Sequence, residues 1–238
     1  MKKVWIGVAL FVAAMVAVFG VLALTREKAP GDKQQKANFD AAMKAYKEAI
    51  EDSSDGATQR IIELSEKIES SDDYGRVEKA AKAYIKDLIV PYYTADDLQQ
   101  SKLYKNGITT SLISEQQPDF VDAMDDSTKT IAALNALRDV ADNMFLRDKA
   151  AEYLDEDLDQ YYKDLFDSEV KEFYDNTKLK QQYFDLVNKM LPKAQYYDGI
   201  LRFLIDNKGS WRLEDNKITF KTTKLTNLYN AMINNRNF

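Results

Sequence analysis

Apolar residues recur along most of this chain at spacings of four, three and four positions, and this period constrains the fold more than any other feature. Side chains at that spacing lie on one stripe of an α-helix. One such stripe is formed by Phe39, Met43, Tyr46 and Ile50. The repeated stripes predict a mainly all-α fold, with an antiparallel helical bundle over residues 38–238.

Local signals predict where some of these helices begin and end. Pro91 is expected to end the helix before it, because the residue that precedes a proline is pushed out of helical geometry. Asn176-Thr177 is expected to cap the start of a helix, and Thr223 is expected to cap the last one. Pro118 suits the first turn of a helix.

The pattern changes near the C-terminus. Residues 210–214 and 217–221 alternate apolar and polar side chains, which is typical of strands, and Asp215-Asn216 between them suits a two-residue turn. A small β-hairpin is therefore predicted at about 210–221. A lone hairpin is barely stable in water, so we expect it to pack on helices.

The run from Val4 to Leu24 carries no charge. At about 1.5 Å per residue its 21 residues span roughly 31 Å, the thickness of a bilayer core. A cleaved signal peptide is the alternative. Signal peptides, however, have a shorter apolar core of about 7 to 15 residues, which is followed by small residues at the cleavage site. We therefore predict a transmembrane signal-anchor over residues 1–24 and a polar linker over residues 25–37.

The orientation of this anchor depends on two opposing signals. Basic residues do not favour an outside C-terminus, because Lys2 and Lys3 precede the run whereas Arg26 and further lysines lie after it. The likeness of the first 24 residues to a signal sequence favours export of the rest of the chain. The predicted location is the cell membrane, crossed once, with an extracytoplasmic C-terminal domain.

The composition excludes several classes of site. The chain has no cysteine and no histidine. Disulfides, thiolate zinc sites, cysteine nucleophiles and the serine–histidine triad are therefore absent. Phosphate-binding and dinucleotide-binding glycine motifs are missing as well. We predict no catalytic residue, no cofactor and no metal ligand.

Two further chemistries need only carboxylates. Asp155, Asp157 and Asp159 have the spacing that opens an EF-hand loop, but Gln160 and Phe166 stand where Gly and Glu are required. We expect a solvated helix face there instead of a calcium site. A carboxylate-dependent cell-wall hydrolase remains an alternative, although every acidic candidate lies among other charges.

Charge is unevenly distributed along the body. The segment from Glu152 to Asp175 has ten acidic and two basic residues, whereas Asn176 to Phe238 has eleven basic and five acidic residues. One interpretation is that the two segments pair with each other, at roughly 0–1 kcal/mol per exposed pair. The other is that the basic segment is a surface for an acidic partner, a lipid headgroup or an anionic polymer. Nucleic acid is not expected, because the body is acidic overall.

Tyrosine is abundant, with 14 residues that include three doublets. Rings at the rim of a bundle are the simpler explanation, and a protein-binding or glycan-binding surface is the sharper one. The candidate interaction surface consists of Tyr161, Tyr162, Tyr196, Tyr197, Lys178, Lys180, Lys217, Lys221 and Lys224.

These observations favour a non-enzymatic binding protein. The predicted function is that of a scaffold, adaptor or accessory subunit of a cell-envelope assembly, held to the lipid bilayer through Val4 to Leu24. Its expected partner is an envelope protein, with an anionic polymer or glycan as the alternative. A ligand or glycan sensor module is the second hypothesis, with a pocket between helices.

Overall fold

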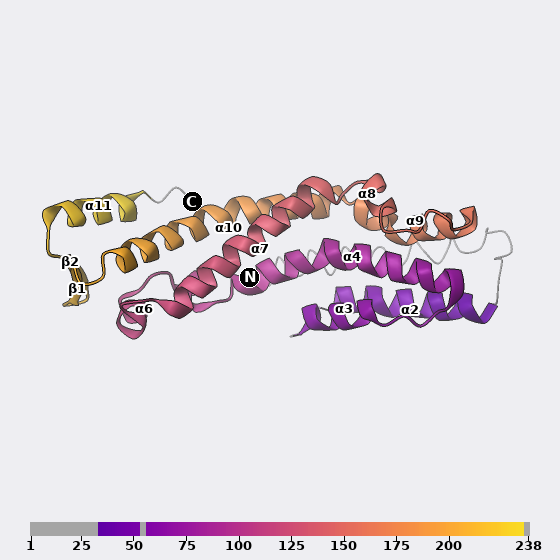
Figure 1. Cartoon of the computed structure of the whole chain (residues 1–238), viewed down its shortest axis with the longest axis horizontal. Coiled ribbons are helices and arrows are strands. Elements are labelled where there is room, and N and C mark those ends of the chain that lie inside the picture. Colours follow the sequence, from indigo (N-terminus) through magenta and orange to yellow (C-terminus); the bar gives the residue numbers. More distant parts are fainter. Residues whose placement is uncertain (1–32, 53–55, 236–238) are drawn as a thin grey trace. The chain divides into compact units, whose positions relative to one another are not determined.

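The computed structural model describes residues 33–52 and 56–235, which are mainly helical (Figure 1). A two-stranded antiparallel hairpin near the C-terminus completes the described elements, so the prediction of a mainly helical fold with a small hairpin is confirmed for them. The helices are α2 (Lys33–Glu51), α3 (Ala57–Glu66), α4 (Asp72–Leu98), α5 (Lys102–Asn106), α6 (Thr110–Gln116), α7 (Val121–Asn143), α8 (Arg147–Ala151), α9 (Gln160–Tyr174), α10 (Thr177–Asp206) and α11 (Thr223–Asn234).

The predicted membrane anchor, Val4 to Leu24, lies outside the described residues. Among the helices that are described, none combines the length and the apolar character that a bilayer span requires. The predicted linker over residues 25–37 lies partly outside them too. Its last residues belong to a helix, because α2 already begins at Lys33.

The chain divides into two compact units. Of the described residues, unit 1 contains those up to Val90 and Asp142–Lys180, and unit 2 contains Pro91–Ala141 and those from Gln181 onward. Helices α2, α3, α8 and α9 therefore belong to unit 1. Helices α5, α6 and α11 and the hairpin belong to unit 2, and the division falls inside α4, α7 and α10.

The core of unit 1 is built from the predicted stripes and from tyrosines that also make hydrogen bonds. Phe39 and Tyr46 of α2 are fully buried, as is Tyr84 of α4. The Tyr46 hydroxyl donates to the backbone oxygen of Lys82 at 3.2 Å, and the Tyr84 hydroxyl donates to that of Met144 at 2.8 Å. These bonds satisfy polar atoms that burial would otherwise leave at a cost.

The hairpin of unit 2 consists of β1 (Trp211–Glu214) and β2 (Lys217–Phe220). Asp215 and Asn216 both have positive φ, 48° and 59°, as a two-residue type I′ turn requires. Trp211 faces Phe220 across the strands. The predicted hairpin is therefore confirmed, with its turn at the expected residues.

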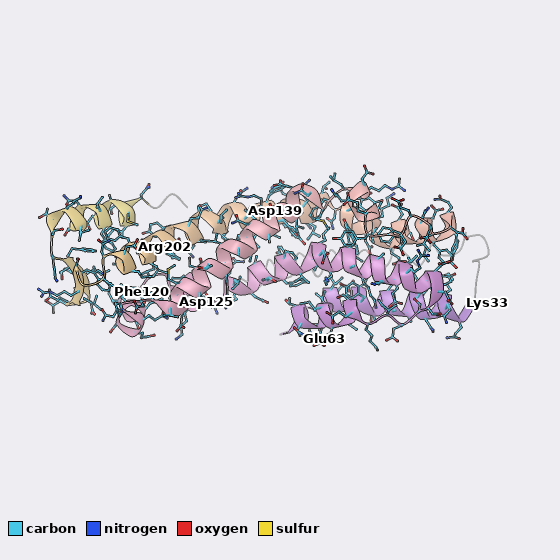
Figure 2. All side chains as sticks on the ribbon, viewed as in Figure 1. Lys33, Glu63, Phe120, Asp125, Asp139 and Arg202 are labelled. Atoms are coloured by element: carbon cyan, nitrogen blue, oxygen red, sulfur yellow. The ribbon has the colours of Figure 1, made fainter. Side chains whose placement is uncertain are left out.

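Aromatic side chains hold the hairpin on the helices of unit 2. The Trp211 indole N–H donates to the backbone oxygen of Leu204 at 2.7 Å, and its ring stacks on Phe120, which Figure 2 labels. On the other strand, Phe220 contacts Phe203 of α10 and Tyr229 of α11, with ring centres 5.7 Å and 5.3 Å away. The hairpin thus packs on helices, as its small size requires.

The predicted helix starts differ in how closely they match the structure. The Asn176 side chain accepts from the Leu179 N–H at 2.9 Å, so the predicted cap of α10 is confirmed. The cap of α11 is Thr222, one residue before the predicted Thr223. Pro118 follows a cis peptide bond and lies before α7, which begins at Val121, so its predicted place in the first turn is wrong.

The prediction that Pro91 ends its helix is wrong, because α4 continues through it to Leu98. Tyr92 and Tyr93, directly after the proline, are buried. Tyr92 also stacks on Tyr183 with ring centres 5.1 Å apart. We infer that this packing outweighs the cost of an interior proline, about 3 kcal/mol.

The segment with Asp155, Asp157 and Asp159 was predicted to be helical, and this is also wrong. It forms turns between α8 and α9, and α9 begins only at Gln160. The Arg76 guanidinium of α4 binds Asp155 at 2.8 Å and also binds Asp157. A basic side chain that is far from this turn in the sequence thus binds its carboxylates.

Candidate functional site

The nine residues of the predicted interaction surface belong to both units. Four of them lie in unit 1 and five lie in unit 2, so the structure describes them as two separate sets. Unit 1 holds Tyr161, Tyr162, Lys178 and Lys180. Unit 2 holds Tyr196, Tyr197, Lys217, Lys221 and Lys224.

The tyrosines of the unit 1 set pack against a third tyrosine. Tyr162 is buried and lies edge-on to Tyr74 of α4, with ring centres 5.2 Å apart and planes at 84°. Tyr161 is half-buried, and its hydroxyl lies 3.3 Å from that of Tyr74. These are ordinary spacings for packed aromatic rings. Tyr162 therefore contributes to the core, and Tyr161 lies at its rim.

Lys178 and Lys180 lie in the first turn of α10, directly after the Asn176 cap. Lys178 is exposed and Lys180 is half-buried. Basic side chains are unfavourable at this end of a helix, because the helix dipole is positive there. Helix stability therefore does not account for two lysines at these positions.

The acidic segment from Glu152 to Asp175 forms ion pairs with basic side chains of unit 1. Lys47 of α2 binds two of its glutamates, Arg76 of α4 binds two of its aspartates, and Arg147 and Lys149 of α8 bind one carboxylate each. The partners of Lys47 are Glu169 and Glu172, those of Arg76 are Asp155 and Asp157, and those of Arg147 and Lys149 are Asp167 and Glu152.

The tyrosines of the unit 2 set lie on α10 and join it to two other helices. The Tyr196 hydroxyl donates to the backbone oxygen of Ile233 in α11 at 3.2 Å. The ring of Tyr197 lies 5.7 Å from that of Tyr104 in α5. The ammonium of Lys193 lies 5.7 Å from the Tyr197 ring centre, within the range of a cation–π contact. Both tyrosines of this doublet are half-buried and contribute to packing within unit 2.

The three lysines of the unit 2 set lie close together in the sequence, on the hairpin and at the start of α11. Lys217 belongs to β2, Lys221 comes directly after that strand, and Lys224 lies in the first turn of α11. All three are exposed, and within the described residues their ammonium groups have no carboxylate within 4 Å. We call Lys217, Lys221 and Lys224 the hairpin lysines.

The nearby basic residues Lys208 and Arg212 differ from the hairpin lysines. Lys208 pairs with Asp119 at 3.1 Å, and Arg212 pairs with Glu214 at 2.8 Å. Their charges are therefore already neutralised by neighbours. The hairpin lysines add positive charge to this end of unit 2, and Asp215 in the turn offsets part of it.

Unit 1 has an open hollow of about 520 Å³ whose rim is formed by α8, the start of α9 and the turns between them. Of the carboxylates that line it, Glu152, Asp155 and Asp167 are paired with lysine or arginine. The described residues contain no cluster of three acidic, histidine or cysteine side chains that could hold a metal ion. The hollow is thus lined mainly by charged side chains, several of which already form ion pairs.

Sequence reasoning missed two buried ion-pair clusters in unit 1. One joins Lys47 to Glu169 and Glu172, and the other joins Glu78 to Lys82 within α4. The spacing of Glu78 and Lys82, four positions apart, is a detectable signal for a helical pair. No local signal pairs Lys47 with the glutamates of α9, because these residues are distant in the sequence.

No known relative shows what either set of residues does. Comparisons with protein-family models, curated proteins and solved structures found no match to this chain. A function must therefore be inferred from the geometry of the chain itself, and above all from where its charges are neutralised.

Proposed function

We propose that this chain is a membrane-tethered, extracytoplasmic binding protein that acts without catalysis, as a scaffold, adaptor or accessory subunit of an envelope assembly. The tether is Val4 to Leu24, whose uncharged length suits a bilayer core. The partner is an envelope protein with an acidic surface. The hairpin lysines form the docking surface for it.

The observation that carries this proposal is how the acidic segment of unit 1 is neutralised. Lys47, Arg76, Arg147 and Lys149 supply its cations from within that unit. This supports the second interpretation of the charge pattern, in which the basic C-terminal segment serves a partner. The exposure of the hairpin lysines supports it too, because exposed cations can meet a partner without first breaking an ion pair.

Charges at the rim of an interface mainly raise the rate of association and select the partner. Binding through the hairpin lysines should therefore weaken as salt rises, since exposed charges are screened within about 8 Å at physiological ionic strength. The packed hairpin provides a firm support for these side chains, because Trp211 bonds to Leu204 of α10 and Phe220 packs on Phe203 of the same helix.

The test is crosslinking of the full chain in native membranes, followed by quantification of the crosslinked partner. The variant is the triple substitution Lys217→Glu, Lys221→Glu and Lys224→Glu. A matched control reverses three other exposed lysines of unit 2, Lys102, Lys105 and Lys189, and so makes the same change in net charge.

We expect the hairpin variant to lose the partner while its melting temperature stays unchanged, and the control to keep the partner. High salt should reduce crosslinking of the unmodified protein. Full partner recovery by the hairpin variant would contradict the proposal. So would a lower melting temperature in that variant alone, which would assign these lysines a structural role. Recovery of an anionic glycan in place of a protein would support the alternative partner.

A further inference from the structure

The contact between α2 and α9 in unit 1 contains more negative than positive charge. The Lys47 ammonium lies 2.9 Å from a carboxylate oxygen of Glu169 and 2.8 Å from one of Glu172. All three side chains are at most 18% exposed. One largely buried cation therefore bridges two carboxylates that lie one turn apart on α9.

A third carboxylate lies beside this bridge. Glu51, one turn after Lys47 on α2, has one carboxylate oxygen that is buried and has no hydrogen-bond partner among the described residues. Its charge acts on Glu172. A third carboxylate thus lies near the two that share the Lys47 ammonium, and its buried, unpaired oxygen is unfavourable.

Within residues 33–52 and 56–235, no ion pair brings a second cation to the carboxylates of Glu51, Glu169 and Glu172. On α2, Glu48 adds a further negative charge beside Glu51 and is itself 3.8 Å from Lys44. From α3, Arg60 faces the end of α2 but binds Asp52 at 2.7 Å. The cluster therefore keeps an excess of carboxylates, which favours the uptake of a proton.

The electrostatic environment agrees with this geometry. Burial raises the pKa of Glu172, and the charges of Glu169 and Glu51 raise it further, although Lys47 lowers it. Burial also raises the pKa of Glu51, together with the charge of Glu48. For Lys47, burial lowers the pKa, but the two glutamates of α9 outweigh this effect and leave it raised, so Lys47 stays charged near neutral pH.

We propose that the carboxylates of Glu51 and Glu172, beside the bridge from Lys47 to α9, take up a proton in mild acid and that this proton tightens the contact between α2 and α9. When the proton leaves, the carboxylates repel one another and the contact loosens. The contact between α2 and α9 in unit 1 is thereby sensitive to pH. It is independent of the hairpin lysines, which lie in unit 2.

The direction of this effect is opposite to ordinary acid denaturation. A carboxyl group whose pKa is raised by folding keeps its proton in the folded state at a pH where the unfolded chain has lost it. Its contribution to stability is therefore present in acid and disappears as the pH rises through the folded-state pKa. The window begins just above the ordinary glutamate pKa of about 4.3.

The test is amide hydrogen exchange of the full chain in detergent micelles at pH 5.5 and pH 8, corrected for the intrinsic effect of pH on exchange. We expect peptides from α2 to exchange several-fold more slowly at pH 5.5. Glu172→Gln should remove this difference, because glutamine is neutral at both values. The matched control Glu152→Gln, an exposed glutamate that is paired with Lys149, should retain it.

Glu51→Gln provides a second variant, because it leaves the bridge from Lys47 to α9 intact. It too should reduce the pH difference, and it decides the matter if Glu172→Gln does not fold. Equal corrected exchange of α2 at both pH values in the unmodified chain would overturn the proposal. A full pH difference that persists in a folded Glu172→Gln or Glu51→Gln variant would overturn it as well.

Discussion

The Lys82 ammonium lies 2.7 Å from the Glu78 carboxylate one turn earlier in α4, and both side chains are almost completely buried. Glu78 also accepts hydrogen bonds from the backbone N–H groups of Glu69 and Ser70 and from the Ser70 hydroxyl. Lys82 donates to the backbone oxygen of Lys67 at 2.6 Å. This ion pair thus fastens the connection between α3 and α4 to the core of unit 1.

Replacing Lys82 with methionine should strongly destabilise the protein. The variant keeps the apolar stem of the side chain but leaves the Glu78 carboxylate buried without its cation, which typically costs about 3–5 kcal/mol. Urea denaturation measures the loss. Lys36→Met is the matched control, because Lys36 and Asp40 form a pair of the same spacing on the surface of α2. The control should lose less than about 1 kcal/mol, and equal losses would contradict the importance of burial.

Arg76 should keep the turns between α8 and α9 well ordered. Its guanidinium binds Asp73, Asp155 and Asp157 through different nitrogens, a geometry that a lysine cannot reproduce. Arg76→Lys should therefore speed amide exchange over residues 152–159. The matched change Arg138→Lys, at an exposed position of α7, should have no effect there. Unchanged exchange in the Arg76 variant would show that the turns are held by other contacts.

Two glycines of unit 2 should respond to alanine in opposite directions. Gly107 has φ +76°, and an added Cβ would lie 3.0 Å from the Tyr197 hydroxyl, so Gly107→Ala should cost about 1–2 kcal/mol. Gly199 lies inside α10, where the nearest atom, Met232 Cε, would be 3.8 Å from an added Cβ. Gly199→Ala should stabilise by about 0.5–1 kcal/mol, because glycine weakens a helix interior. Thermal melting of both variants checks the contrast.

The anchor prediction can be tested with one charge. If Val4 to Leu24 spans the bilayer, Ala14→Arg places a cation near its centre at a cost of about 2.5–3.5 kcal/mol. The protein should then be lost from carbonate-washed membranes. Ala29→Arg, beyond the apolar run, is the control and should stay membrane-bound. The intact mass of the unmodified protein should include Met1, and a mass that begins after Ala23 would show that the segment is cleaved.

Local sequence rules predicted the features whose causes are also local. The turn at Asp215-Asn216 and the alternation around it act within a few residues, and both are confirmed. The cap at Asn176 depends on a bond to Leu179, three positions away. For the same reason, the stripe of Phe39, Met43, Tyr46 and Ile50 correctly located α2.

The local rules were wrong where distant packing opposed them. Pro91 carries a strong local signal for the end of a helix, yet the burial of Tyr92 and Tyr93 keeps α4 continuous. Asp155 and Asp157 were predicted to lie on the solvated face of a helix, yet Arg76, 79 positions before Asp155, binds them in a turn. A local rule contains no information about either partner.

For this protein, the sequence by itself determined the helical class, the hairpin with its turn, and the absence of cysteine and histidine chemistry. These depend on residue identity and on spacings within one or two turns. Only the tertiary structure decided which charges meet, namely Lys47 with Glu169 and Glu172, and Glu78 with Lys82 inside the core. The physical reason is that an ion pair is set by distance and burial in three dimensions, and both arise only when segments far apart in the sequence pack together.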